Sequence, residues 1–172
     1  MIIEPKVFGD ERGFFMETYN LERYKEVGID GDFVQDNLSS SMKGVLRGLH
    51  YQKAPFAQGK LVQVVKGRVL DVAVDIRKDS LIYGQYVSVE LSGENKKQFW
   101  IAPRLAHGFL SLEDGTIFSY KCTALYNPAS EGGIIWNDKD LNIDWQLKEN
   151  GIETPIVSDK DKQNICFTEL SD

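Results

Sequence analysis

Short stretches of alternating apolar and polar residues recur along residues 45–136 of the chain. An alternation with a period of two is typical of a β-strand that buries one face. The strictest example is the stretch 70–76, for which we predict a half-buried strand. Its apolar face consists of Leu70, Val72, Val74 and Ile76, and Asp71, Ala73 and Asp75 form the other face.

The rest of the pattern predicts more short strands and little helix. Lys66-Gly67 is a turn signal that would join 61–65 to 69–76 in a hairpin. Ser39 to Ser41 is typical of a polar loop. Other strands are expected at 33–37, 86–91, 98–101, 116–126 and 134–136. Short strands at this spacing indicate an all-β sandwich or barrel.

Two short helices are expected near the ends of the chain. The first runs from Leu21 to Val27, with Asn20 as its N-cap and Gly28 ending it. The second lies near 159–164, in an otherwise polar segment. We therefore predict an all-β domain with short terminal helices.

The composition fits one globular domain, which we assign to residues 1–172. With 42% hydrophobic and 27% charged residues, a chain of this length can bury a core without disulfides or structural metal ions to stabilise it. The net charge of −6 argues against nucleic acid or an anionic membrane as a partner, but a few local cations could still bind a small anion. No apolar run could span a bilayer.

The cellular compartment is inferred from the start of the chain and from the cysteines. Met1 to Pro5 lacks the basic and apolar regions of a secretory signal. Cys122 and Cys166 are isolated thiols, which are more typical of reduced cysteines than of a disulfide. We expect a cytoplasmic protein.

The stretch Arg47-Gly48-Leu49-His50-Tyr51-Gln52, followed by Gly59-Lys60, combines several reactive side chains. Histidine titrates near neutrality, so His50 could serve as a base at cellular pH. Arg47 could bind an anion, and Lys60 could stabilise an oxyanion. The same residues are also compatible with an ordinary strand that carries a surface histidine.

Two further residues have two interpretations each. His107 lies in a turn bounded by Pro103 and Gly108, where it could contact a ligand or bond a backbone carbonyl. Tyr120 shares a strand face with Phe118 and is either core packing or a general acid opposite a base.

The pattern does not favour a metal site or another cofactor. A mononuclear site usually takes three or four side-chain ligands, and this chain has two distant histidines and no His-x-His. A thiolate ligand from Cys122 stays open. A metal-dependent cupin oxygenase or isomerase and a non-catalytic sugar-binding barrel are the alternative classes.

Taken in order, the motifs resemble those of one family, the dTDP-4-dehydrorhamnose 3,5-epimerases. The resemblance extends from Asp10-Glu11-Arg12-Gly13-Phe14-Phe15 to Lys160-Asp161. Between them come Arg47-Gly48-Leu49-His50-Tyr51-Gln52, Gln58-Gly59-Lys60-Leu61-Val62, Asp71-Val72-Ala73-Val74-Asp75-Ile76-Arg77, Leu91-Ser92-Gly93-Glu94-Asn95-Lys96, Ala106-His107-Gly108-Phe109, Tyr120-Lys121 and Trp136-Asn137-Asp138.

The resemblance implies a cupin-type β-barrel, or jelly roll, and a homodimer with strands contributed across the interface. It implies an isomerase of dTDP-L-rhamnose biosynthesis that needs no metal. The substrate of such an enzyme is dTDP-4-dehydro-6-deoxy-D-glucose, which is a dTDP-4-keto-6-deoxyhexose. The enzyme inverts its C3 and C5 to give dTDP-4-dehydro-L-rhamnose. An epimerase of C3 or C5 alone, or of another nucleotide-linked 4-ketosugar, would have the same catalytic set and remains open.

The resemblance also implies a role for each site residue. His50 matches the general base, Asp161 the acid that orients it, Tyr120 the general acid and Lys60 a residue near the C4 oxygen. Pattern alone would assign most of the remaining positions to surface or turns. The positions that match nucleotide or sugar contacts are Arg12, Glu17, Gln35, Asp36, Asn37, Arg47, His107, Glu131 and Lys160.

Two features depart from the simplest expectation. In a regular strand Arg47 and His50 would point to opposite faces, so either Gly48 marks a bulge or Arg47 serves another part of the site. The family usually has Gly and Phe where this chain has Arg104 and Leu105, close to His107.

Overall fold

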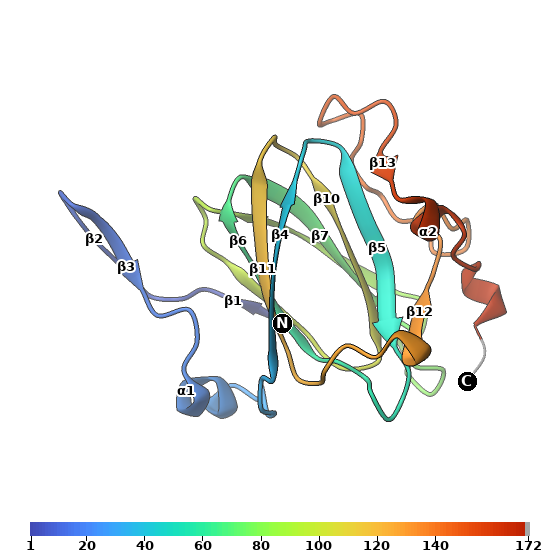
Figure 1. The fold of residues 1–172 in the computed structure, drawn as a ribbon, viewed down its shortest axis with the longest axis horizontal. Helices are drawn as coiled ribbons and strands as arrows, with labels where there is room; N and C mark the ends of the chain where they lie inside the picture. The colour runs from blue at the N-terminus through green and yellow to red at the C-terminus, as the bar shows by residue number, and fades with distance from the viewer. Residues whose placement is uncertain (171–172) are drawn as a thin grey trace.

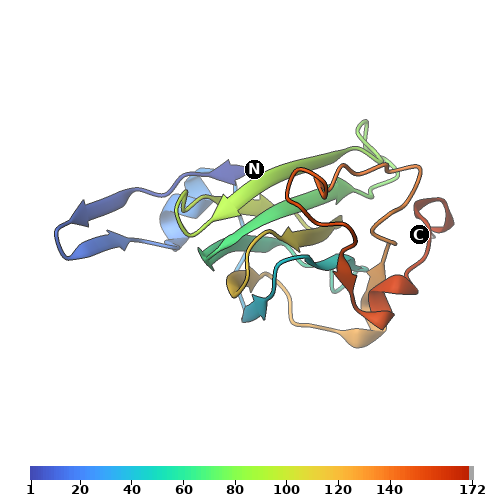
Figure 2. The same ribbon diagram turned by 90° about the horizontal axis from the view of Figure 1, so that it is seen from above.

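Two β-sheets face each other across the molecule, and a hairpin projects from one end (Figures 1 and 2). The computed structural model describes residues 1–170. The five-stranded sheet has the order β1 (Ile2–Ile3), β9 (Gln98–Ile101), β6 (Lys60–Lys66), β11 (Thr116–Cys122) and β4 (Gln35–Ser41). The six-stranded sheet has the order β12 (Glu131–Gly133), β5 (Val45–Gln52), β10 (Leu105–Ser111), β7 (Arg68–Asp75) and β8 (Tyr86–Ser92), with β13 (Ile156–Val157) parallel to β5.

Helix is confined to short pieces outside the sheets, so the all-β prediction is confirmed. The fold is the cupin-type jelly roll, in which the two sheets stay open at their edges. The projecting hairpin and the helical pieces are β2 (Val7–Asp10), β3 (Gly13–Met16), α1 (Leu21–Glu26), η1 (Pro128–Ser130), α2 (Asp159–Lys162) and η2 (Phe167–Glu169). Both predicted helices form, and the Asn20 side chain caps α1 by accepting from the Arg23 N–H.

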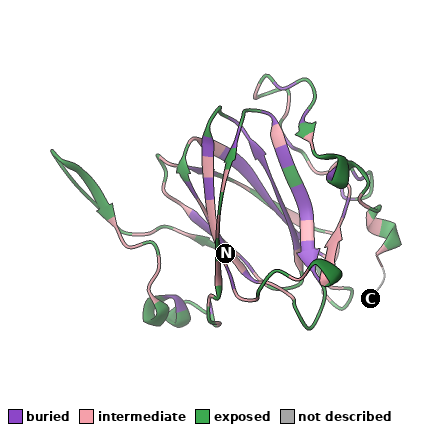
Figure 3. Ribbon diagram, in the orientation of Figure 1, coloured by how far each residue is buried: buried purple, intermediate pink, exposed green. Residues whose placement is uncertain are grey.

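The central strands of the six-stranded sheet, β7 and β10, are buried on both faces (Figure 3). Its inner face meets the five-stranded sheet around Val62, Phe109 and Phe118. Its outer face is covered by the C-terminal segment, where Trp145 and Ile152 pack over the strands. The C-terminal segment is therefore held against the sheet by apolar burial, worth about 25 cal/mol per Å².

Several local expectations are wrong. β6 and β7 lie in different sheets, so the turn at Gly67 does not make a hairpin. The Asp71 face of β7 is buried like the other, because it points between the sheets. Ser39 to Ser41 belongs to β4, and His107 lies within β10 rather than in a turn. The expectations for Ser39, Asp71 and His107 did not anticipate polar side chains between the sheets, where all three lie.

Cys122 and Cys166 are both free thiols, as expected for reduced cysteines. Within residues 1–170, no helix is long and apolar enough to cross a membrane.

Packing against the outer face should dominate the stability of the fold. Leu110 is completely buried in that cluster, so we expect Leu110→Ala to lower the free energy of unfolding by about 2–5 kcal/mol. Leu81 is fully exposed, and Leu81→Ala should change the free energy of unfolding by less than about 0.5 kcal/mol. Urea unfolding checks both variants, and equal losses would contradict the assigned core.

Candidate active site

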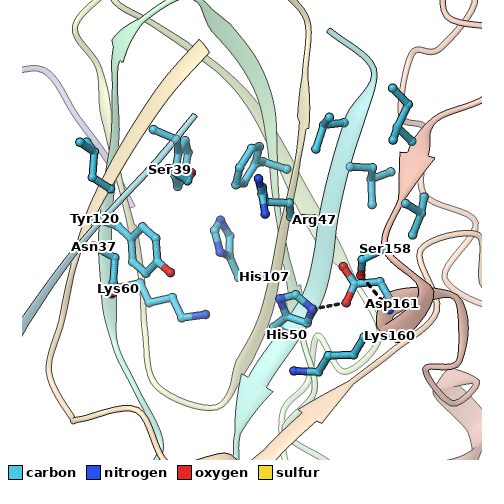
Figure 4. Close-up of a pocket in the computed structure, with 17 residues that line it drawn as sticks. Asn37, Ser39, Arg47, His50, Lys60, His107, Tyr120, Ser158, Lys160 and Asp161 are labelled. Carbon is cyan, nitrogen blue, oxygen red and sulfur yellow. Dashed lines mark hydrogen bonds and ion pairs between the residues drawn. The ribbon is translucent and has the colours of Figure 1, made fainter. Parts of the chain in front are cut away.

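A cavity of about 560 Å³ opens between the two sheets and reaches the C-terminal segment (Figure 4). Polar side chains enter it from both sheets. Its lining consists of Asn37, Leu38, Ser39, Val45, Leu46, Arg47, His50, Lys60, His107, Phe109, Phe118, Tyr120, Ile156, Val157, Ser158, Lys160 and Asp161. It therefore combines an apolar wall with at least three potential cations, in a chain that is acidic overall.

His50, on β5, is held by a carboxylate from the other end of the chain. Its Nε2 lies 2.6 Å from Oδ1 of Asp161, which is almost fully buried, while Oδ2 accepts from the Gly48 N–H at 3.2 Å. Ser158 caps α2, and its Oγ accepts a hydrogen bond from the Asp161 N–H. This hydrogen bond fixes the position of Asp161 and its carboxylate. A carboxylate only accepts, so a neutral His50 carries its proton on Nε2 and a lone pair on Nδ1.

Burial by itself raises the pKa of Asp161, but the hydrogen bonds from His50 and from the Gly48 N–H outweigh it and hold the pKa below its ordinary value. The aspartate is thus a carboxylate throughout the physiological range. Nδ1 of His50 has no hydrogen-bond partner within residues 1–170 and belongs to a side chain that lines the cavity.

A β-bulge brings Arg47 and His50 to the same cavity. On β10 the residues paired with them, Phe109 and His107, are two apart, whereas Arg47 and His50 are three apart, so the register shifts. Gly48 lies in this bulge with φ of 130°, and a Cβ there would sit 2.5 Å from the Cα of Gly108. The close approach requires glycine, and the bulge explanation of the spacing is confirmed.

Lys60 and Tyr120 enter from the opposite sheet, on β6 and β11 (Figure 4). Burial holds the pKa of Lys60 below its ordinary value, and the nearby Cys122 and Asp71 only partly oppose this effect. Burial also raises the pKa of Tyr120, so its phenol keeps its proton well above neutral pH. A phenol and an amine therefore face the histidine across the cavity.

His107, on β10, lies directly opposite His50 on β5. Its Nε2 is 3.0 Å from each carboxylate oxygen of Asp71, on β7. Asp71 is fully buried, and His107 is 7% exposed. The site thus contains two histidine–aspartate pairs side by side.

The mouth of the cavity carries a second group of polar contacts. Lys160 donates to Glu131 at 2.6 Å, and the Tyr126 hydroxyl donates to the same carboxylate. These hydrogen bonds lower the pKa of Glu131 against the raising effect of burial. Of the predicted nucleotide contacts, Lys160 lines the cavity and Glu131 lies beside it.

The three predicted contacts on β4 are placed differently from one another. Asn37 lines the cavity and accepts from the Gln35 side chain. Asp36 points to the outer face, where it pairs with Lys121 at 2.8 Å. The Gln35 side-chain oxygen also accepts a hydrogen bond from the Tyr126 N–H, so Gln35 connects β4 to the mouth of the cavity.

Arg12 and Glu17 lie away from the cavity of the chain that carries them. Arg12 is at the tip of the β2–β3 hairpin and pairs with Asp10, and Glu17 pairs with Arg23 at 2.7 Å. The hairpin projects away from the two sheets (Figure 1). Their assignment as ligand contacts stays a prediction.

Arg104 and Leu105 do not line the cavity. Arg104 has φ of 67°, a conformation that favours glycine, which is the residue expected there. Leu105 packs against the core between the sheets. These two replacements therefore affect the backbone and the core rather than the cavity wall.

Metal ligands do not gather anywhere in the described part of the chain. Within residues 1–170, no group of three or more His, Cys, Asp or Glu side chains is arranged to hold a metal ion.

A model of the family described as dTDP-4-dehydrorhamnose 3,5-epimerase matches residues 1–169. The chain belongs to this family. It is 56% identical to the dTDP-4-dehydrorhamnose 3,5-epimerase of Shigella flexneri, in an alignment that covers 98% of this chain and 91% of that protein.

Solved structures of family members share the fold. A dTDP-6-deoxy-D-glucose-3,5-epimerase from Legionella pneumophila, in complex with dTDP-4-keto-L-rhamnose, is 53% identical, with a TM-score of 0.93 over 99% of this chain and 88% of that chain. A 3'-monoepimerase from Streptomyces bikiniensis, in complex with dTDP-quinovose, is 33% identical, with a TM-score of 0.90 over 97% of this chain and 83% of that chain. The family fold therefore accommodates double and single epimerases.

Some residues of the site were not singled out from the sequence. Asp71 was placed on the solvent side of a half-buried strand, although an aspartate between valines and leucine could have suggested a buried charge. Ser158, which fixes Asp161, and Ser39, on the cavity wall, gave no distinct signal.

The Asp161 carboxylate should make stability depend on pH in a definite direction. Its pKa in the folded protein lies below the ordinary 3.8, so the unfolded chain takes up the proton first and the stabilisation is lost as pH falls below about 4. We expect Asp161→Asn to lose about 1–3 kcal/mol at pH 7 and to show a smaller further loss than the wild type between pH 7 and pH 3. Urea unfolding at the two pH values measures this.

The matched control is Asp159→Asn on the same helix, since Asp159 is 90% exposed. This variant should follow the wild type at both pH values. An Asp161→Asn profile that coincides with the wild type would contradict the assigned hydrogen bonds.

Proposed function

We propose that the protein binds dTDP-4-dehydro-6-deoxy-D-glucose in this cavity and inverts its C3 and C5. The product is dTDP-4-dehydro-L-rhamnose, for dTDP-L-rhamnose biosynthesis. One observation carries this proposal. His50 and Tyr120 enter one cavity from opposite sheets, so a sugar ring between them presents one face to a base and the other to an acid. Inversion at carbon by proton removal and return needs that arrangement.

Nδ1 of His50 removes the proton from the carbon beside the C4 ketone. The electron pair of the broken C–H bond moves into the ring, and the ketone oxygen becomes an enolate oxygen. Asp161, at 2.6 Å from Nε2, orients the imidazole and stabilises the imidazolium that forms. The C–H bond and the π bond of the ketone break, while an N–H bond to His50 and a C=C bond to C4 form, so the step needs neither oxidant nor reductant.

Lys60 and His107 stabilise the enolate oxygen. Neither the Lys60 ammonium nor Nδ1 of His107 is used in a hydrogen bond within residues 1–170, so both can meet a ligand in the cavity that they line. Preorganised donors aimed at a developing charge are among the largest catalytic effects, with one donor worth about 3 kcal/mol.

Tyr120 returns a proton to the opposite face of the same carbon. Burial raises the pKa of its hydroxyl, so the residue is protonated when the enolate forms. After the proton returns, solvent restores His50 and Tyr120 to their starting states. The same sequence then repeats at the other carbon beside the ketone.

The nucleotide diphosphate extends towards the mouth of the cavity. The Arg47 guanidinium, held by Ser41 Oγ at 3.3 Å, can bind phosphate oxygens with its remaining donors. Lys160 and Asn37 supply further donors along the wall. The family members crystallised with dTDP-sugars support a nucleotide of this kind.

A single epimerase is the alternative, because it requires the same base and acid. In heavy water, the wild type should exchange the hydrogens at both C3 and C5 of the dTDP-4-keto sugar, and a coupled assay with the following reductase and its nicotinamide cofactor should report product. Exchange at one carbon would assign a mono-epimerase. No exchange at either would refute the epimerase proposal.

Removing either catalytic group should affect a different step. We expect His50→Ala to lower exchange and turnover at least 10²-fold while leaving dTDP binding nearly unchanged. Tyr120→Phe should still exchange the hydrogen that His50 removes, but form inverted product at least 10²-fold more slowly. Proton NMR in heavy water follows exchange and inversion together.

Tyr86→Phe serves as the control, because Tyr86 bonds the Asp144 N–H away from the cavity. It should behave as the wild type. A Tyr120→Phe variant with normal inversion would return Tyr120 to a packing role.

The active unit is a homodimer in which the β2–β3 hairpin reaches a second copy of the chain. A two-stranded hairpin is marginally stable alone, and this one exposes Phe8, Phe14 and Phe15 by 53–70%. Within residues 1–170 it forms ladder bonds only with itself. Contact with a second copy buries this surface and brings Arg12 and Glu17 to that copy's cavity.

A shared site makes two inactive variants complement each other. Arg12→Ala and His50→Ala, co-expressed with different tags and purified through both, should recover up to about half of wild-type activity, because every such dimer is mixed and has one intact site of two. The coupled assay on doubly purified protein measures this. Activity no greater than the sum of the two variants alone would place Arg12 outside the site.

A further inference from the structure

The two histidine–aspartate pairs use the same atoms but lie in different surroundings. In each pair Nε2 faces a carboxylate, which leaves Nδ1 towards the cavity. The His50 side chain is 31% exposed, and Asp161 also accepts from the Gly48 N–H. The His107 side chain is 8% exposed and Asp71 is completely buried.

Asp71 has few groups to stabilise a negative charge. His107 is its hydrogen-bond partner among the described residues, at 3.0 Å to both oxygens. A buried carboxylate supported by one donor is costly to keep ionised. The pair therefore favours a state without net charge, in contrast to Asp161, which receives a second donor.

The neutral state of the pair contains one more proton than a carboxylate beside a neutral imidazole. That proton can sit on Asp71, as a carboxylic acid that donates to Nε2. It can instead sit on His107, as an imidazolium paired with a carboxylate. In both arrangements the second ring nitrogen, Nδ1, carries a hydrogen.

Nδ1 of His107 is accessible from the cavity. Among the described residues, the buried side-chain atoms without a hydrogen-bond partner are Ser39 Oγ, Arg68 Nε and Asn164 Nδ2. Nδ1 of His107 has no partner either, yet it is not fully buried, and the side chain lines the cavity. A ligand in the cavity can therefore reach it.

The charged and titratable groups around the pair come from the neighbouring strands. They are His50 on β5, Lys60 on β6 and Tyr120 on β11. Burial raises the pKa of Asp71, with His107 and Lys60 opposing, and lowers the pKa of His107, with Asp71 opposing. Burial thus disfavours charge on both partners, whereas Lys60 and a charged His50 favour a negative pair.

We propose that Asp71 and His107 keep one shared proton, so that Nδ1 of His107 is a fixed hydrogen-bond donor to the ligand oxygen on which negative charge develops. Asp71 is then a positioning residue for His107. This inference rests on the proposed epimerase function for the identity of that oxygen. The same type of residue pair thereby serves as a base at His50 and as a donor at His107.

Nitrogen NMR of the wild-type protein tests the protonation state directly. The chain has two histidines, so labelling with [15N]histidine gives two sets of ring signals, which His50→Gln assigns. Between pH 6 and 9 we expect Nδ1 of His107 to stay at the position of a protonated nitrogen. Nδ1 of a neutral His50 should appear at the position of an unprotonated one.

An unprotonated Nδ1 of His107 at neutral pH would overturn the proposal. This outcome is independent of turnover, whereas absent exchange with the dTDP-4-keto sugar would refute the epimerase function and leave the spectrum unchanged. The two failures are therefore distinguishable.

Asp71→Val tests the positioning role. Without the carboxylate, the Nδ1 signal should move towards the unprotonated position, and kcat should fall about 10²-fold with KM changed less than about twofold. An unchanged Nδ1 signal or an unchanged kcat would contradict the role of Asp71. If this variant does not fold, the wild-type spectrum still decides the protonation state.

Discussion

The hydrogen bond between Asp161 and His50 joins two residues that lie 111 positions apart in the chain. Asp161 comes from a short helix near the C-terminus, and His50 from a strand in the six-stranded sheet. The carboxylate reaches the histidine because the C-terminal segment packs its apolar residues on the outer face of that sheet. Packing on one face of the sheet therefore determines the chemistry on the other.

The two facing sheets carry different catalytic side chains. The six-stranded sheet carries His50 and His107, and the five-stranded sheet carries Lys60 and Tyr120. A flat ring between them has a base on one side and an acid on the other, with donors at its oxygen. Rigid strands hold these groups, so little reorganisation is needed as charge moves through the ring.

Sequence periodicity predicted the fold class and the two helices because strand alternation and capping are local properties. It failed for Ser39 to Ser41, Asp71 and His107, because polar residues that point between the sheets look like solvent-facing ones. The bulge at Gly48 could be stated only as one of two possibilities, since a register shift depends on the partner strand. Motif order identified the family, whereas the partners of His50 and His107 required the fold.

The central claim is that two different groups, one on each face, remove and return the proton. Its most direct test is a single turnover in ordinary water with a dTDP-4-keto sugar that carries deuterium at C3. Two-group inversion predicts product without deuterium at C3, because the hydrogen that arrives comes from Tyr120 and ultimately from solvent. Product that retains the deuterium in the inverted position would show that one group carries the hydrogen across, and would contradict the account.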